Sequence, residues 1–268
     1  MNAIPDIPGS PSPVAPSPDE VRHGLAHGQF VAYYQPAVDL ASGQVNSLET
    51  LARWQHPDLG LLEPACFLPA MREHDMLREL SERMLTQALY AGRGWRDAGM
   101  PMRVSVNVPL SLLAHTRLDD WVASRLQQAT LESGLLILEF SEVMLSLDWD
   151  LADRQLAWLR RAAVGVAVDE FGIGLGLVTP LTRQRFSMLK IDSAIVHGAS
   201  IDPKRRKWLA AALMQCKRSG LESVAVGIEE PADLDLVRTL GCQAAQGFLL
   251  APPMPQDDVE IWIRQRKS

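Results

Sequence analysis

The chain has 268 residues, of which 47% are hydrophobic and 22% are charged, and its formal net charge is −6. This composition is typical of a globular protein, and the length allows one large core, because α/β barrels often reach about 200 to 250 residues as one domain. A negative charge argues against broad nucleic-acid binding, which requires basic surface. We therefore expect no nucleic-acid partner, and we expect any anionic ligand to be held by a local site.

The first 20 residues differ in composition from the rest of the chain. Residues 1–20 are rich in proline and serine and have few apolar side chains to bury, so we expect a disordered tail followed by one domain over residues 21–268. No apolar run approaches the roughly 18 residues that span a bilayer, so we expect no direct membrane insertion. Cys66, Cys216 and Cys242 are far apart in the sequence, which indicates free thiols and a cytoplasmic location.

Strand-like and helix-like segments alternate along the domain. Residues 30–38 and 45–54 are rich in aromatic and β-branched side chains, which predicts two strands joined by a turn at Ser42–Gly43. Two helices are expected after Pro64, because apolar residues recur with helical spacing up to Leu89. Six more strand-like runs alternate with helical stretches: 103–108, 135–140, 164–169, 187–192, 222–226 and 242–246.

About eight strands separated by helices are compatible with two kinds of parallel sheet. One is an open, doubly wound sheet, and the other is a closed barrel. Polar side chains occur where nearly every strand-like run ends, and a closed ring would bring these ends together. We therefore predict a TIM-like (β/α)8 barrel with its site at the C-terminal ends of the strands, and we keep the doubly wound sheet as the alternative.

The residues at these strand ends indicate a metal and phosphate site. Most are hard oxygen donors, which favour Mg²⁺ or Mn²⁺ over zinc: Glu49, Asn107, Glu139, Asp169 and Glu170. Lys190 adds a positive charge, so a phosphodiester would suit the site. One strand-end carboxylate alone is more often a group bonded to the backbone, but the recurrence favours a functional site. Val226 is the position that breaks the series.

From residue 31 to residue 253 the chain resembles the EAL-domain family, which comprises cyclic di-GMP phosphodiesterases and their non-catalytic relatives. YYQPAVDL is similar to the family's YYQPIVDL, ETLAR stands where EALLR belongs, and RWQHPDLGLLEPACFLP is similar to RWQHPELGLVSPAEFIP. VSVNV, LEFSE, VDEFG, LKID and LGCQAAQGF then follow in the family's order. The resemblance implies a barrel of EAL type that binds cyclic di-GMP.

The resemblance also implies roles for individual residues. Glu49, Asn107, Glu139 and Asp169 match metal ligands, and Glu170 is the second carboxylate of the pair after the sixth strand-like run. Further residues match catalytic or ligand-binding positions: Lys190 near the attacking water, Gln35 and Arg53 at the dinucleotide, Gln246 near the catalytic centre, Glu142 as the anchor of the next loop, Asp192 with the ligand-binding residues and Glu229 with the catalytic ones.

Three departures from the family pattern affect the expected activity. The family's VAEGVE reads VAVGIE here, so Val226 replaces the first glutamate and only Glu229 remains. The family's DDFG reads DEFG here, so Glu170 replaces the second aspartate. We therefore predict a degenerate EAL-domain protein, inactive or very weak as an enzyme, that regulates by binding cyclic di-GMP, a protein, or both. The alternative is an active phosphodiesterase that uses Mg²⁺ or Mn²⁺, with Glu229 or Glu170 covering for the missing acid.

The third departure lies in the loop after Glu170, where DFGTGYSS has become EFGIGLGL. Ile173, Leu175 and Leu177 replace polar or aromatic residues there. We interpret them either as an apolar surface for a protein partner or as side chains that fold back into the pocket. Because family members often dimerise through this region, the resemblance also implies a homodimer.

Overall fold

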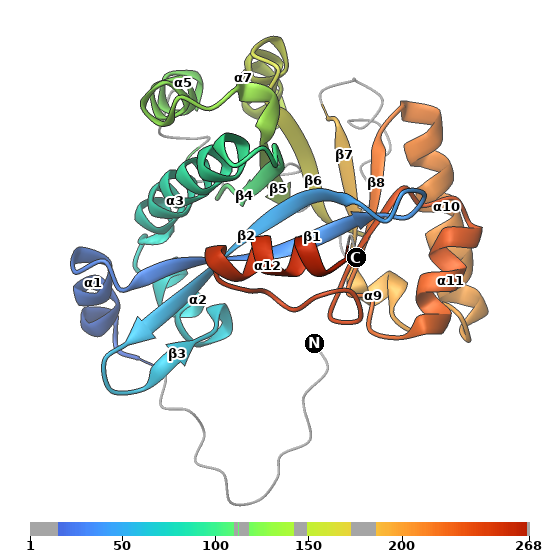
Figure 1. Ribbon diagram of the computed structural model, residues 1–268, viewed down its shortest axis with the longest axis horizontal. Helices are drawn as coiled ribbons and strands as arrows, with labels where there is room; N and C mark the ends of the chain where they lie inside the picture. Colours follow the sequence, from blue (N-terminus) through green and yellow to red (C-terminus); the bar gives the residue numbers. More distant parts are fainter. Residues whose placement is uncertain (1–15, 110–111, 113–117, 142–148, 173–185, 267–268) are drawn as a thin grey trace, which may run out of the picture.

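The computed structural model describes residues 16–109, 112, 118–141, 149–172 and 186–266 (Figure 1). Eight strands form a closed ring, because β1 pairs with both β2 and β9 while the remaining neighbours pair in the order β9-β8-β7-β6-β5-β4-β2. They are β1 (Phe30–Asp39), β2 (Val45–His56), β4 (Arg103–Asn107), β5 (Leu136–Ser141), β6 (Gly165–Phe171), β7 (Met188–Ile191), β8 (Glu222–Val226) and β9 (Ala244–Gln246). The prediction of a barrel is confirmed, and the doubly wound sheet is excluded.

The first strand gives this barrel its unusual topology. β1 runs antiparallel to both of its neighbours, whereas all other adjacent strands of the ring are parallel. The short turn that contains Ser42 and Gly43 leaves no room for a crossover helix, so β1 and β2 must form a hairpin. As a result, the residue of β1 that lines the mouth comes before its floor residue in the sequence, whereas on the parallel strands it comes after.

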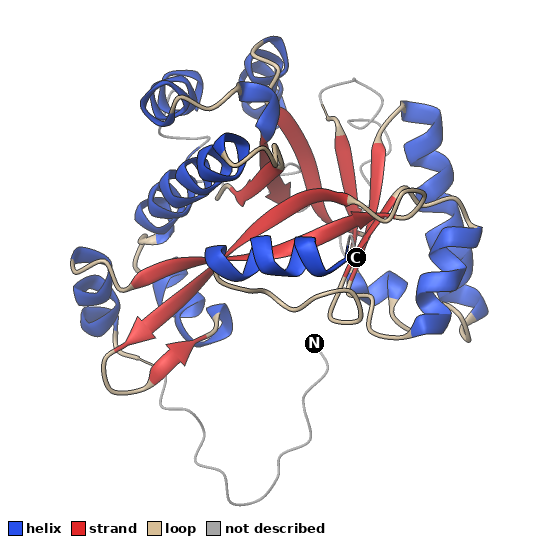
Figure 2. Cartoon of the chain, in the orientation of Figure 1, coloured by secondary structure: helices blue, strands red, loops and turns tan. Residues whose placement is uncertain are grey.

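Helices surround the ring of strands (Figure 2). They are α1 (Pro18–Ala26), α2 (Pro64–Glu73), α3 (Leu77–Asp97), α5 (Leu118–Ala129), α7 (Trp149–Arg161), α9 (Ser193–Val196), α10 (Pro203–Ser219), α11 (Pro231–Thr239) and α12 (Gln256–Arg266), with the 3-10 turn η1 at Ser133–Leu135. Among the described segments, no helix is long and apolar enough to cross a bilayer. The three cysteines are free.

The beginning of the folded domain differs from the sequence expectation. Residues 18–20, which we expected in the disordered tail, form the first turn of α1. Ser17 caps this turn: its Oγ accepts a hydrogen bond from the amide of Glu20, while the Glu20 carboxylate accepts one from the amide of Ser17. Pro18 suits the first helical position because its missing N–H would have no partner there. The sequence SPDE contains this signal, which the proline-rich composition obscured.

A small lobe extends from one side of the barrel. The outer parts of β1 and β2 continue beyond the ring and carry α1, α2 and the short strand β3 (Gly60–Leu62), which the sequence analysis missed (Figure 1). The rings of Phe30 and Trp54 stack on each other in this lobe, Phe67 packs edge-on against both, and all three are almost completely buried. These aromatic residues belong to the same buried cluster as the residues between the sheet and the helices, so the core of the lobe is continuous with that of the barrel.

The inside of the barrel is filled by side chains in layers. One layer is apolar and consists of small or medium-sized buried residues from six strands: Ala37, Ile137, Ala167, Met188, Val224 and Ala244. Side chains on a strand alternate between the two faces, so the residue two positions further along points into the barrel again. This apolar layer therefore forms a floor, and the next inward-facing residues line the mouth.

Candidate functional site

The mouth of the barrel is lined by one inward-facing residue from each strand of the ring. Stepping two residues from the floor gives Gln35, Glu139, Asp169, Lys190, Val226 and Gln246. Glu49 and Asn107 complete the layer, because Glu49 is the ladder partner of Gln35 and Asn107 is the ladder partner of Glu139. Seven of these eight side chains are polar, and the exception is Val226. The sequence prediction that polar strand ends meet is therefore confirmed by the register.

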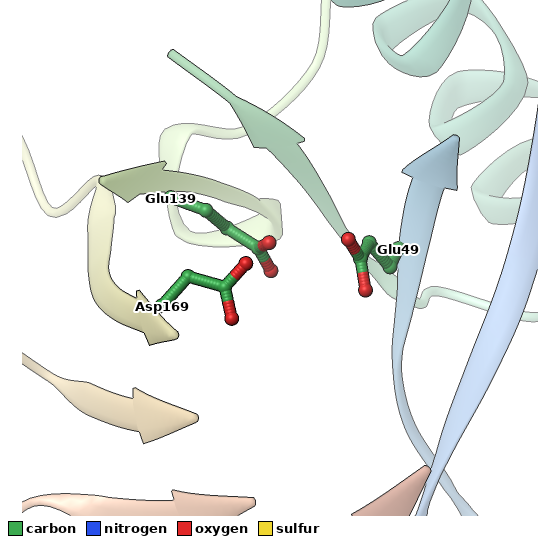
Figure 3. A group of neighbouring side chains, drawn as sticks. All are labelled: Glu49, Glu139 and Asp169. Atoms are coloured by element: carbon green, nitrogen blue, oxygen red, sulfur yellow. The ribbon is translucent and has the colours of Figure 1, made fainter. Parts of the chain in front are cut away.

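Three carboxylates of this layer point toward one another (Figure 3). Glu139 and Asp169 come from the adjacent strands β5 and β6, and Glu49 faces them from β2. One carboxylate oxygen of each lies within 4.8 Å of those of the other two. All three side chains point into the same layer of a closed ring, so the fold itself holds these carboxylates close to one another.

The ammonium of Lys190 contacts all three carboxylates. Its Nζ is 2.8 Å from Glu49 Oε2, 2.7 Å from Glu139 Oε2 and 3.6 Å from Asp169 Oδ1. Only 3% of Lys190 is exposed. A buried charge is strongly destabilising unless it is paired, so the lysine and the carboxylates stabilise one another in the folded chain.

Two glutamines connect Glu49 with the chain that follows β9. Gln246 Nε2 donates to Glu49 Oε2 at 2.8 Å and to Gln35 Oε1 at 3.1 Å, and Gln35 Nε2 donates to the carbonyl of Ala251 at 3.0 Å. A carbonyl can only accept, so Ala251 fixes which end of the Gln35 amide faces Gln246. Gln246 therefore shares Glu49 Oε2 with Lys190, and this chain of bonds helps to fix the position of the Glu49 carboxylate.

The pKa values of the acids follow from burial and these contacts. Burial alone would raise the pKa of Glu49, but Lys190, Gln246 and Asn107 outweigh it and lower that pKa. Burial is the largest influence on Glu139 and on Asp169 and raises the pKa of each, although Lys190 opposes the shift. Burial would lower the pKa of the Lys190 ammonium, but the three carboxylates outweigh it and raise that pKa. The lysine therefore stays charged.

Glu170 lies beside this cluster and does not enter it. Within the described part of the chain, the carboxylates close enough to share one cation are those of Glu49, Glu139 and Asp169. Glu170 is exposed, and its backbone has a φ of 55°. Left-handed backbone is tolerated better by aspartate and asparagine than by a longer side chain. The expected role of Glu170 as a metal ligand receives no support from this position.

Two other expected site acids, Glu229 and Asp192, are not members of the carboxylate cluster, although the charge of Asp192 is close enough to raise the pKa of Asp169. Glu229 is exposed on the segment that follows β8. Asp192 caps α9, and its Oδ1 accepts a hydrogen bond from the amide of Ala194 at 2.7 Å. Arg53 is buried on β2, where its guanidinium donates to the carbonyl of Ala52 and lies over the ring of Tyr33. Glu142, Ile173, Leu175 and Leu177 lie outside the described residues.

Two glycines that the sequence analysis did not single out shape the turns at the mouth. Gly227, directly after Val226, has a φ of 77°, and a Cβ at this position would lie 2.4 Å from Ser193 Cβ. Gly247, directly after Gln246, would place a Cβ 2.1 Å from the carbonyl oxygen of Ile228. Both turns therefore require glycine. They allow the segments after β8 and β9 to pack closely at the mouth.

The donor chemistry of the site fits one hard divalent cation. Three carboxylates and the amide of Asn107 are the oxygen ligands that Mg²⁺ or Mn²⁺ prefers, and the Lys190 ammonium shows that the position favours positive charge. A second ion close to the first would need further donors. Val226 has none, and Glu170 is exposed beside the cluster.

The fold and this site define a barrel protein with a polar, carboxylate-rich mouth. Residues 19–253 match the EAL domain, and the chain belongs to the EAL-domain family. It is 30% identical over 236 residues to the cyclic di-GMP phosphodiesterase PA2567 of Pseudomonas aeruginosa, covering 88% of this chain and 40% of that protein. It is 32% identical over 241 residues to the cyclic di-GMP phosphodiesterase RocR of the same species, covering 90% of this chain and 62% of that protein.

A solved structure gives the same result for the fold. The structure of the PaMucR phosphodiesterase in complex with c-di-GMP is similar to this chain with a TM-score of 0.86 and 33% sequence identity. The similarity covers 90% of this chain and 98% of that one. In contrast, this chain spans less than two thirds of the length of PA2567 and of RocR.

Proposed function

We propose that this chain is a degenerate EAL-domain protein that binds cyclic di-GMP and hydrolyses it very slowly or not at all. It would act in cyclic di-GMP signalling as a regulator, through the bound dinucleotide, through a protein partner or homodimer, or through both. Glu49, Asn107, Glu139 and Asp169 would hold any divalent ion, and Gln35, Arg53, Asp192 and Gln246 are proposed to contribute to the ligand site. The phosphodiesterases among its relatives support this ligand.

The observation that carries the proposal is the position of Val226. Its side chain lies in the same layer as the three carboxylates, Lys190 and Gln246, where every other strand contributes a polar group. An isopropyl group can neither bind a cation nor accept a proton from water. Loss of a general base alone typically slows an enzyme by about 10²- to 10⁴-fold, and a lost metal ligand adds to that.

The second candidate is an active phosphodiesterase that produces the linear dinucleotide pGpG with Mg²⁺ or Mn²⁺. Two observations favour it: the relatives are named as phosphodiesterases, and three carboxylates, Lys190 and Gln246 are assembled at the mouth. This candidate requires another group to replace the acid missing at residue 226. Either Glu229 or Glu170 would have to turn inward from its exposed position to do so.

A turnover assay with parallel binding measurements separates the two candidates. Purified protein is incubated with cyclic di-GMP and Mn²⁺, the linear product is quantified by chromatography, and dinucleotide binding is measured calorimetrically with and without metal. We expect binding without appreciable turnover. Turnover on the order of 1 s⁻¹ or faster, the range of ordinary enzymes, would establish the phosphodiesterase instead. Absence of both binding and turnover would leave the protein-binding role.

A further inference from the structure

The ammonium of Lys190 occupies the position at which a divalent ion would bind, whether or not the chain hydrolyses a substrate. The ammonium contacts the same three carboxylates that offer oxygen donors to a divalent ion, and two of these contacts are short: 2.8 Å to Glu49 and 2.7 Å to Glu139. Mg²⁺ and Mn²⁺ bind carboxylate oxygens at about 2.0 to 2.2 Å, so an ion held by all three carboxylates would lie between them, where the ammonium is. Lysine and metal would therefore compete for one position.

The charges of the layer favour the lysine in this chain. Glu49, Glu139 and Asp169 provide at most three negative charges, and Lys190 provides one positive charge. Val226 adds none, so the layer contains one carboxylate fewer than it would with a glutamate at that position. Each buried carboxylate increases the attraction for a cation, and fewer carboxylates leave less attraction for a divalent ion once the ammonium is in place.

We propose that Lys190 is the resident cation of this barrel, and that a divalent ion binds to the three carboxylates only by displacing the ammonium from them. The inference rests on the proposal that Glu49, Glu139 and Asp169 are the cation-binding residues, but it does not depend on whether the chain hydrolyses cyclic di-GMP. It assigns Lys190 a role in keeping the site closed to metal, in addition to any role beside a bound phosphate.

The test measures Mn²⁺ binding, without nucleotide, to the full-length chain and to the variant Lys190→Met. Methionine keeps an unbranched side chain that is one atom shorter and removes the charge. Since repulsion between ammonium and metal is then absent, we expect Mn²⁺ affinity to rise by on the order of tenfold or more, measured by electron paramagnetic resonance of free Mn²⁺. Lys207→Met, which removes an exposed lysine of α10, is the matched control and should leave the affinity unchanged.

The same variant should depend on metal for its stability. Without Lys190 the three carboxylates repel one another, so Lys190→Met should melt at a lower temperature than the unchanged protein in a chelator and gain more from added Mn²⁺. Equal or weaker Mn²⁺ binding by Lys190→Met than by the unchanged protein would overturn the inference, and so would the absence of Mn²⁺ binding in both.

A measurement on the unchanged protein covers the case in which Lys190→Met does not fold. Lysine labelled with ¹³C at Cε reports the environment of each ammonium by NMR, and Mg²⁺ is diamagnetic. Titration with Mg²⁺ should shift the signal of buried Lys190 with the same midpoint as the binding isotherm, while the exposed lysines stay in place. Saturable Mg²⁺ binding that leaves the Lys190 signal unchanged would show that lysine and metal coexist. High phosphodiesterase activity would refute the proposed function and leave this result unaffected.

Discussion

Val226 and Gln246 are partners in the parallel ladder between β8 and β9, so a hydrocarbon side chain lies beside the amide that donates to Glu49. Below Val226, the apolar floor of the barrel includes Val224 and Ala244. Val226 is half-buried and packs against this floor. The apolar interior therefore reaches one layer higher at β8 than at the other strands, and the polar mouth is interrupted there.

Restoring a carboxylate at this position tests whether the interruption limits turnover. The double variant Val226→Glu with Glu170→Asp should hydrolyse cyclic di-GMP at least about tenfold faster than the unchanged protein in Mn²⁺. The first substitution returns a carboxylate to the mouth, and the second places the shorter aspartate at residue 170, whose backbone is left-handed. The measurement is the rate of linear product formation. Val226→Gln with Glu170→Asp has similar size but lacks the charge at 226, and it should gain nothing. If both stay at the original rate, features outside these two positions also prevent catalysis.

Arg53 offers a test of dinucleotide binding. Its buried guanidinium lies on the same strand as Glu49, and a charged hydrogen bond to a phosphate or base typically contributes about 1.5 to 3 kcal/mol. Arg53→Ala should therefore weaken cyclic di-GMP binding by roughly 10- to 100-fold in calorimetry. Arg78→Ala, on the exposed surface of α3, is the control and should have no effect. Equal affinities for the two variants would place the ligand away from Arg53.

Asp233 should make stability depend on pH. Its buried carboxylate accepts hydrogen bonds from the amides of Gly198 and Ser200 at 2.7 and 2.9 Å, and although burial would raise its pKa, these bonds outweigh burial and lower it. A lowered pKa stabilises the folded state above the unfolded value of about 3.9, and the stabilisation is lost as the pH falls through the folded value. Asp233→Asn should cost about 1 to 3 kcal/mol at pH 7.

The measurement is urea unfolding of both proteins at several pH values. The difference between them should be largest near neutral pH and should shrink as Asp233 becomes protonated. A constant difference down to about pH 3 would show that the aspartate acts through shape and not through its charge.

Gly247 tests how closely the turns at the mouth are packed. Because a Cβ would lie 2.1 Å from the Ile228 carbonyl oxygen, Gly247→Ala must push two backbone segments apart, and it should lower the free energy of unfolding by about 3 kcal/mol or more. Gly134→Ala is the control, since no atom lies within 4 Å of its added Cβ and its φ is not positive. Thermal unfolding followed by circular dichroism measures both. Similar melting temperatures would mean that the turn relaxes easily.

The sequence alone determined the alternation of strands and helices and the polar residues at the strand ends. These features follow from local patterns: side chains alternate along a strand, and glycine and proline mark many of the turns between elements. The departure at Val226 was also visible in the sequence, because comparing VAVGIE with the family's VAEGVE requires no structure. The capping box at Ser17 and Glu20 and the short strand β3 were not predicted, because the local signal was obscured by composition or was weak.

Only the tertiary structure decided which of these residues meet. Closure of the ring by an antiparallel β1 brings Gln35 to Gln246, more than two hundred positions away along the chain, and it excludes an open sheet. The same closure places Lys190 between Glu49 and Glu139, while Glu170 and Glu229 remain exposed. Distances of this kind depend on which strands become neighbours when the ring closes, and a local pattern of side chains does not specify the pairing of strands that are far apart in the sequence.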